Sequence, residues 1–373
     1  MKHIVLAPDS FKGTMTAAEI CAVQREAIRR LLPGVTVDEV PMADGGEGFI
    51  ETCRRLRGGE RVEVTVTGPL HTPVGAFYLR LPDGSAVIEM AAAAGLPLAG
   101  GRLDPLRATT YGVGELILHA VERGAHRILL GLGGSATNDG GIGMAAALGY
   151  CFYDGEGRPV EPLAKHLGKI VSVRRERELP EVEITAACDV DNPLCGPSGA
   201  TAVFGPQKGV TPALFPALED GMSHLAALME RDTGAPVADT PGAGAAGGLG
   251  AAVLYFLRGT LRPGIELLLD AAGFDGLLER ADLVITGEGC MDRQSVRGKV
   301  PAGVGQRCRR RGVPCVALCG SLGEGAEELY GCGISAMFST LHTFTDLETS
   351  ARTCREDMRL LTDAVIRLLL SRE

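Results

Sequence analysis

Short apolar runs separated by helical stretches occupy both ends of the chain. Residues 4–7 form an apolar run, and apolar side chains then recur at helical spacing over residues 20–31. Thr16 and Glu19 form a capping box, which predicts that the helix begins directly after Thr16. Similar short apolar runs return toward the C-terminus, at 283–286, 313–318 and 336–339, and the chain ends in a predicted helix around 365–370. This alternation of strands and helices predicts a parallel α/β sheet.

The middle of the chain carries a different pattern. Val62, Val64 and Val66 alternate with polar residues, and a second alternation at 77–81 ends near a turn at 83–84. Alternation at a period of two predicts antiparallel strands, and helical patterns follow further along. We therefore predict an α/β protein with two domains. One is a doubly wound, Rossmann/flavodoxin-like parallel-sheet domain built from both chain ends, and the other is an inserted α/β domain with a mixed sheet.

This pattern sets the expected domain boundaries. We expect the Rossmann-like domain to comprise residues 1–64 and 283–373, and the inserted domain to comprise residues 65–282. Ligands in open α/β sheets bind outside the carboxyl ends of the strands, and two-domain proteins favour the cleft between domains. The active site is therefore expected in that cleft.

Composition and charge exclude several classes of protein. The chain has 373 residues, is 45% hydrophobic and carries a formal net charge of −9, which argues against a nucleic-acid partner. Its eleven cysteines form no Cys-x-x-Cys pair, as expected for free thiols in a reducing cytoplasm. The uncharged stretch 240–257 contains five glycines, so we expect a packed core helix there and no membrane partner. The N-terminus lacks the apolar core of a signal peptide, and we predict a soluble cytoplasmic protein.

The 52 glycines gather in short clusters between apolar runs. The richest cluster spans residues 131–141, directly after an apolar run and before a helix. Backbone N–H groups of such a loop can cradle a phosphate, although a tight turn alone would also favour glycine. The run Gly131-x-Gly133-x-x-Ala136, with Asp154 downstream, also matches a relaxed dinucleotide fingerprint. A nicotinamide-dependent oxidoreductase is therefore an alternative, but the polar residues of the loop go unexplained by it.

Three further loops combine glycines with charged or hydroxyl groups. Lys12 follows the first strand, where a cation suits a carboxylate or phosphate, although lone lysines are usually solvated. Asp189 and Asp191 lie two residues apart, so that one can bind Mg²⁺ while the other faces a hydroxyl, although this is also an ordinary polar turn. The loop at 286–299 brings carboxylates, hydroxyls, an amide and a lysine to one strand end.

Common catalytic signatures are absent from the sequence. There is no Gly-x4-Gly-Lys-Ser/Thr phosphate loop, no His-Glu-x2-His pair and no Gly-x-Ser-x-Gly elbow. The seven histidines lie outside all four loops, which makes a histidine triad or a zinc site improbable. Lysines, carboxylates and N–H groups remain, and these are what phosphoryl transfer requires.

The chain resembles the bacterial-type glycerate kinases, the glycerate kinase I family. The segments that carry this resemblance are DSFKG (9–13), MADGGEG (42–48), GLGGSATNDGG (131–141), CDVDNPL (188–194), FGPQKG (204–209), GAAGGLG (244–250) and TGEG..D.QS..GK (286–299). The resemblance implies a two-domain α/β fold, with ATP and D-glycerate as substrates and 2-phosphoglycerate as product. The motifs themselves leave formation of 3-phosphoglycerate open.

Roles for individual residues follow as hypotheses. The residues expected to carry catalysis are Asp189, Asp191 and Lys12, with Asp292 as a reserve base. Those expected to bind the nucleotide are Gly133, Gly134, Ser135, Asn138, Asp139, Thr286, Gly287, Glu288, Asp292 and Gln294. Those expected to bind the acid are Asp9, Ser10, Asp44, Gly45, Gly46 and Lys208. Mg²⁺ is assigned to Asp189 and Asp191, ATP is the expected cosubstrate, and a homodimer is left open.

The remaining alternatives make different predictions. A galactokinase-like kinase would use the 131–141 loop as its phosphate cradle within another β-α-β fold, which the two chain ends do not favour. A sugar-acid sensor would bind glycerate without turning over ATP, which the carboxylate-rich loop at 286–299 disfavours.

Overall fold

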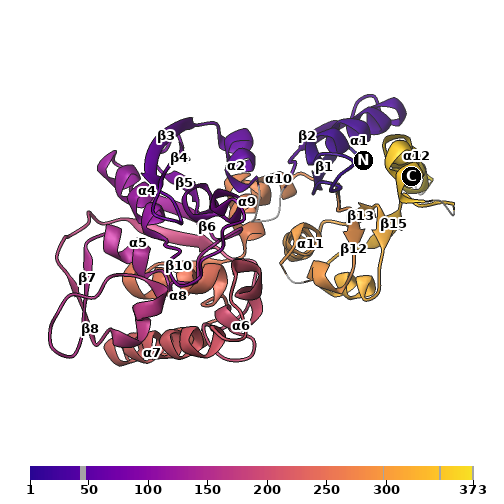
Figure 1. Cartoon of the computed structure of the whole chain (residues 1–373). Helices are drawn as coiled ribbons and strands as arrows, with labels where there is room; N and C mark the ends of the chain where they lie inside the picture. Colours follow the sequence, from indigo (N-terminus) through magenta and orange to yellow (C-terminus); the bar gives the residue numbers. More distant parts are fainter. Residues whose placement is uncertain (43–47, 297, 344–345, 372–373) are drawn as a thin grey trace. The chain divides into compact units, whose positions relative to one another are not determined.

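A computed structural model describes residues 1–42, 48–296, 298–343 and 346–371. The chain divides into two compact units, Met1–Asp44 with Ile265–Glu373 (unit 1) and Gly45–Gly264 (unit 2). Both ends of the chain belong to unit 1 (Figure 1). The boundaries differ from the expected positions after residues 64 and 282, for reasons that the packing of three helices explains.

Helix α2 (Phe49–Arg57) belongs to unit 2 because it packs on strands of that unit's sheet. Its Ile50 N–H donates to Glu89 Oε1 over 3.0 Å. Helices α9 (Gly264–Ala271) and α10 (Phe274–Leu278) contribute carboxylates to Arg307 on α11 (Val300–Arg311) of unit 1. Because of these contacts, the chain passes between the two units after residues 44 and 264, nearer the N-terminus than expected in both cases.

The sheet of unit 1 is entirely parallel, in the order β15-β13-β11-β1-β2. Its strands are β1 (His3–Pro8), β2 (Thr36–Glu39), β11 (Leu283–Gly287), β13 (Cys315–Cys319) and β15 (Ala336–Ser339). Counted along the chain within this unit, the order is the flavodoxin-like 2-1-3-4-5. The predicted Rossmann/flavodoxin-like sheet from both chain ends is therefore confirmed.

Helices cover this sheet on both faces. α1 (Ala17–Leu31) packs against α12 (Leu347–Leu370), and Figure 1 shows them on one side of the strands with α11 on the other. The predicted capping box is present, because Glu19 N–H donates to Thr16 Oγ1 (3.2 Å) and Thr16 N–H donates to Glu19 Oε2 (2.9 Å). Two short strands, β12 (Cys290–Met291) and β14 (Ser321–Leu322), pair beside the sheet.

The sheet of unit 2 is mixed, as predicted, in the order β10-β9-β6-β5-β4-β3. Strands β5 (Ala86–Glu89), β6 (Arg127–Gly131), β9 (Glu183–Ala187) and β10 (Thr260–Arg262) run parallel. β3 (Glu60–Thr67) and β4 (Pro73–Arg80) are antiparallel, as the period-two pattern indicates. The other elements of the unit are α3 (Ala91–Ala94), α4 (Tyr111–Glu122), α5 (Ile142–Ala147), β7 (Tyr150–Tyr153), β8 (Ser172–Arg175), α6 (Ala200–Phe204), α7 (Phe215–Thr233) and α8 (Ala245–Phe256).

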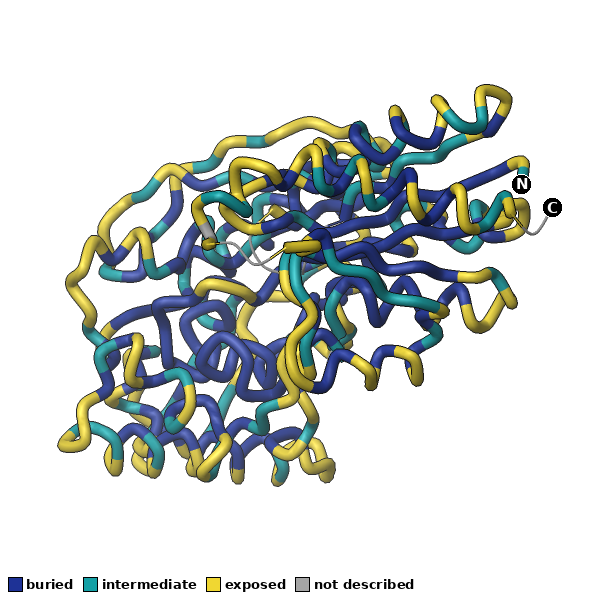
Figure 2. The backbone as a smooth tube through the Cα atoms, turned by 90° about the vertical axis from the view of Figure 1, so that its right-hand side faces the viewer, coloured by how far each residue is buried: buried dark blue, intermediate teal, exposed yellow. Residues whose placement is uncertain are grey.

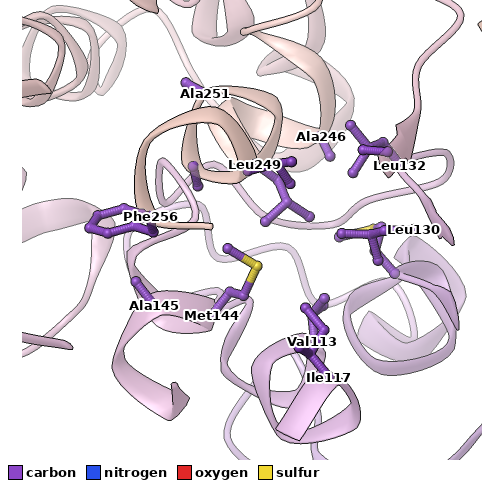
Figure 3. Packing of buried hydrophobic residues seen from close by; sticks show 14 of the residues in the cluster. Val113, Ile117, Leu130, Leu132, Met144, Ala145, Ala246, Leu249, Ala251 and Phe256 are labelled. Atoms are coloured by element: carbon purple, nitrogen blue, oxygen red, sulfur yellow. The ribbon is translucent and has the colours of Figure 1, made fainter. Parts of the chain in front are cut away.

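Helices α4, α5 and α8 share one core with strand β6. Figure 3 shows Ile117, Leu130, Met144 and Leu249 from these elements meeting in the cluster. The central strands β1, β11 and β13 of unit 1 are buried, whereas the edge strands β2 of unit 1 and β3 of unit 2 are mostly exposed or half-buried. Figure 2 shows buried and exposed positions along the backbone. Within the described ranges, no helix combines the length and apolar character that crossing a bilayer requires. The stretch around α8 is instead buried in this core.

Candidate functional site

Two loops of unit 1 emerge side by side from the central strands β1 and β11. These strands pair in parallel, from Ile4 with Leu283 to Pro8 with Gly287. In a sheet of the order 2-1-3-4-5 this is the switch point, where successive connections leave toward opposite faces and open a crevice. The β1 loop closes on itself, since Phe11 N–H donates to Met15 O over 2.8 Å. Phe11 is buried and Lys12 is exposed, so the turn carries the cation outward.

A pocket of about 460 Å³ lies at this edge of unit 1. The strand-end loops, together with the start of α12, form its wall. Its lining includes Asp9, Ser10, Phe11, Lys12, Thr14, Glu288, Gly289, Cys290, Lys299, Gly320, Ser321, Thr340, Leu341, Asp346, Ser350, Ala351 and Cys354. The structure thus brings Asp9, Ser10 and Lys12 together with Glu288. Residues that the sequence assigned to the acid and to the nucleotide share one pocket.

Glu288 is the most unusual group in this wall. Its side chain is only 8% exposed, and Lys299 Nζ lies 3.5 Å from Oε2. Oε1 accepts no hydrogen bond from any described residue. Burial raises the pKa of Glu288, while a hydrogen bond with Ser295 and the charge of Lys299 lower it. A buried carboxylate with an unused acceptor beside a pocket makes Glu288 a candidate ligand contact.

The neighbours of Glu288 hold the strand ends together. Thr286 is buried, and its hydroxyl donates to Ala7 O over 2.8 Å. A Cβ on Gly287 would lie 1.7 Å from Leu318 O, so only glycine allows this approach of β11 to β13. The described lining of the pocket includes neither Asp292 nor Gln294, because Gln294 N–H donates to Asp292 Oδ1 (2.8 Å) in a separate turn. Asp44, Gly45 and Gly46 lie outside the described residues.

The glycine-rich loop of unit 2 follows β6 and is held from within. Gly133 and Gly134 are exposed at its tip, whereas Ser135, Asn138 and Asp139 are buried. The exposed backbone can face a ligand, and the buried side chains fix the loop. Asn138 Nδ2 donates to Thr201 Oγ1 over 3.2 Å.

Asp139 is the centre of this internal support. Its carboxylate accepts hydrogen bonds from Thr110 N–H and Oγ1 (both 2.8 Å), Gly141 N–H (3.1 Å) and Gly143 N–H (3.3 Å). Burial raises the pKa of Asp139, and these four donors lower it. With its oxygens occupied by the protein, Asp139 positions the loop.

Lys208 reaches the same loop from the turn after α6. It is only 1% exposed, and its Nζ donates to Ser135 Oγ and Thr137 O, each over 2.7 Å. Burial lowers the pKa of Lys208 to about 7, and the charge of Asp139 opposes that shift. Its amine therefore binds the loop in this structure.

A break in α8 also supports the loop. Ala246, Gly247 and Gly248 have positive φ angles of 53°, 69° and 92°. A Cβ on Gly247 would lie 2.1 Å from Thr137 O, and Gly140 N–H donates to Gly247 O over 2.9 Å. The GAAGGLG segment is therefore glycine-rich because the backbone of the glycine-rich loop lies against it.

Asp189 and Asp191 follow β9, the strand next to β6. Both are exposed, and Gly264 N–H donates to Asp189 Oδ1 over 2.7 Å. Leu132 N–H donates to Ala187 O over 3.3 Å, so this loop and the glycine-rich loop leave the same edge of the sheet. Among the described residues, no group of three His, Cys, Asp or Glu side chains could hold a metal ion. Two exposed carboxylates still suit Mg²⁺, which usually takes one or two from the protein and the rest from phosphates and water.

Comparison with known proteins decides the family. Residues 4–370 match the model of the glycerate kinase family. The chain belongs to this family. The similarity spans both units and every loop described above.

Individual relatives agree with the family match. The chain is 43% identical to a glycerate kinase of Bacillus subtilis (strain 168), over 95% of this chain and 94% of the relative. It is 41% identical to a glycerate 2-kinase of Escherichia coli (strain K12), over 94% of this chain and 93% of the relative. A crystal structure from Salmonella typhimurium LT2, provisionally named glycerate kinase 2, gives a TM-score of 0.85 at 41% identity and covers 99% of this chain and 98% of its own. The predictions of the family, and of a kinase, are confirmed.

The dinucleotide alternative was wrong in its structural premise. That fingerprint requires the helix after the glycine loop to lead into a neighbouring parallel strand. Here α5 leads to β7, which pairs only with β8 among the described strands. Asp154 lies in a tight turn directly after β7, and its pKa is lowered by the N–H of Arg158 and by the Arg158 guanidinium.

Some functional positions escaped the sequence reasoning. Thr110 lies twenty-nine positions before its partner Asp139, and no motif links the two. Lys299 was seen in its loop but given no role, although it pairs with Glu288. Gly247 was seen only within a motif. Its unusual position inside an apolar helix was the available signal.

Proposed function

We propose that this protein transfers the γ-phosphoryl group of ATP to the C2 hydroxyl of D-glycerate, giving 2-phosphoglycerate. The observation that carries the proposal is the family match over residues 4–370, which includes 41% identity to a glycerate 2-kinase. The strand-end loops supply the groups that this chemistry needs. They offer exposed backbone N–H groups, lysines and carboxylates, while no histidine lies in any of the four loops.

Asp189 and Asp191 are the proposed base and metal ligands. Both are exposed carboxylates on one loop, and they lie two residues apart, a spacing that places side chains of an extended segment on the same side. One accepts the proton of the attacking hydroxyl, and the other would hold Mg²⁺. When bound, Mg²⁺ supplies neutralisation of the phosphate charge.

The remaining roles follow from charge and position. The exposed N–H groups at Gly133 and Gly134 are suited to a phosphate or carboxylate. Lys12 stabilises charge that develops on the transferring phosphoryl group. Asp139 and Lys208 act as positioning residues, because their polar atoms bond to the loop itself. Asp9, Ser10, Asp44, Gly45 and Gly46 remain proposed contacts of the acid.

The cell compartment is a secondary proposal. All eleven cysteines, each within the described ranges, are free thiols, and ten of them are buried or half-buried. Free thiols in this number favour a reducing compartment, the cytoplasm.

A coupled assay of ADP release tests the activity. Purified protein is given Mg-ATP with D-glycerate, and in parallel with L-glycerate and glycolate. The proposal requires turnover with D-glycerate well above ATP hydrolysis in the absence of an acceptor. Turnover only with another hydroxy acid would replace the substrate, and no turnover with any of them would contradict the kinase.

A further inference from the structure

The pocket of unit 1 raises a question about which ligand it holds. On the β1 loop, Ser10 was assigned to the acid and Lys12 to catalysis, whereas Glu288 on the β11 loop was assigned to the nucleotide. All three line one pocket at adjoining strand ends, so one ligand contacts both loops.

The size of the pocket favours the larger ligand. Its volume is about 460 Å³, within the roughly 300–1,000 Å³ of sites that enclose drug-sized molecules. The lining extends from the β1 loop to Ser350 and Cys354 on α12. A three-carbon acid would fill only a corner of this space, whereas a nucleoside phosphate extends along it.

The position of the pocket in the fold points the same way. It lies outside the carboxyl ends of β1 and β11, the switch point of a 2-1-3-4-5 sheet. Flavodoxin, whose sheet has this order, holds a mononucleotide at this position.

The polar groups of the wall match the two halves of a nucleotide. Lys12 is exposed and Lys299 is part-exposed, so both ammonium groups can reach phosphate oxygens. Glu288 Oε1 accepts nothing from the described residues, and a ribose hydroxyl or a base amino group is the kind of donor it lacks. Glycerate offers hydroxyls but no second anionic group to engage two lysines.

We propose that the pocket of unit 1 binds the nucleotide, with Lys12 and Lys299 on the phosphates and Glu288 accepting from the ribose or the base. Lys12 thereby contacts the phosphates of the bound nucleotide, which include the phosphoryl group that is transferred. This inference rests on the proposed function, since it presumes that ATP is the phosphoryl donor.

A thiol in the wall provides a direct test. Cys290 is exposed and lines the pocket, whereas Cys151 is a part-exposed thiol of unit 2 and serves as the control. The intact protein is labelled with N-ethylmaleimide, and each thiol is followed by peptide mass spectrometry. With Mg-ADP at about ten times its Kd, we expect labelling of Cys290 to slow by about tenfold, because only the unliganded fraction reacts. Cys151 is expected to react at its unliganded rate, and D-glycerate is expected to leave Cys290 unchanged.

Variants provide a second measurement by calorimetry. Glu288→Gln and Lys12→Met are each expected to raise the Kd of Mg-ADP by about tenfold, the loss of one charge-assisted contact. The Kd of D-glycerate, titrated alone, is expected to stay within about twofold. Glu324→Gln is the matched control, because Glu324 is 93% exposed and lies outside the lining.

The outcomes separate this inference from the proposed function. The inference is overturned if D-glycerate protects Cys290 from labelling, or if saturating Mg-ADP does not protect it. Turnover of D-glycerate in the same preparation would still support the proposed kinase function. If Glu288→Gln and Lys12→Met raise the Kd of D-glycerate but not that of Mg-ADP, the inference is likewise overturned. A wild-type protein that neither binds Mg-ADP nor turns over overturns both.

Discussion

The glycine-rich edge of unit 2 and the pocket edge of unit 1 are both formed by loops after parallel strands, yet they are built differently. In unit 2 the polar side chains point back into the protein, and Lys208 and Asp139 are both buried. In unit 1 the loop after β1 is closed by its own backbone and by the cap of α1, and Lys12 is exposed. One loop is supported by tertiary contacts and the other by local ones.

This difference shows that similar motifs can carry polar residues for opposite reasons. Ser135, Asn138 and Asp139 hold the glycine-rich loop in shape and leave the exposed backbone of Gly133 and Gly134 to meet a ligand. Lys12 and Glu288 line a pocket, where side chains themselves make the contacts. Substitutions at the two edges should therefore separate stability from ligand affinity.

The largest effect is expected at Asp189. Asp189→Asn retains an oxygen that can accept from Gly264 N–H but removes the proposed base, so we expect kcat to fall roughly 10²- to 10⁴-fold. Steady-state kinetics with D-glycerate and Mg-ATP measure this change. Glu183→Gln, an exposed neighbour on β9, is the control. A kcat within about threefold of wild type would exclude Asp189 as the base.

The next effect tests the tertiary support of the glycine-rich loop. Gly247→Ala places a Cβ against Thr137 O at a positive φ of 69°, so we expect the free energy of unfolding to fall by roughly 2–4 kcal/mol. Denaturant titration measures the loss. Gly276→Ala is the matched control, because nothing lies within 4 Å of its added Cβ. Equal stability of the two variants would refute the contact between α8 and the loop.

Lys208 is expected to make the stability of the protein depend on pH. Its pKa of about 7 in the folded protein lies below the 10.5 of an unperturbed lysine, so between these values the unfolded chain binds more protons. The free energy of unfolding of wild type should therefore rise with pH across this window, relative to Lys208→Met. The expected slope is at most ~1.4 kcal/mol per pH unit. Parallel pH profiles for the two proteins would show that burial leaves the lysine charged.

The smallest effect is expected where support is local. Thr16→Ala removes the capping box of α1, and we expect a loss of about 1 kcal/mol in the free energy of unfolding. Thr16→Ser should recover most of the loss, since the hydroxyl remains. A loss as large as that of Gly247→Ala would mean that the two loops are supported alike.

Much of the fold could be predicted because the spacing of apolar residues along the sequence matches the positions that are buried in the structure. The apolar runs at 4–7 and 283–286 became the adjacent strands β1 and β11, and the alternation at 62–66 became the antiparallel β3. The domain boundaries were harder to read. α2 has its own helical pattern, but its unit is decided by its packing on β4 and β5, which the sequence does not reveal.

The loops of the candidate site could be predicted from the sequence, but the contacts that their side chains make could not. Asp189, Lys12 and the 131–141 loop stand out by residue type and position after a strand. Whether Asp139 faces a ligand or Thr110 depends on contacts between distant segments, which no local pattern encodes. The same holds for Lys208, whose burial could not be inferred from an exposed-looking Gln-Lys-Gly turn.

The most direct test of the proposed function is ³¹P NMR of the product made from D-glycerate and Mg-ATP. Transfer to O2 joins the phosphate to a carbon that bears one hydrogen, so we expect a doublet from coupling to that proton. A triplet would show that the phosphate is on O3, and would contradict the 2-kinase assignment. A spectrum with ADP and inorganic phosphate but no phosphate ester would contradict glycerate phosphorylation altogether.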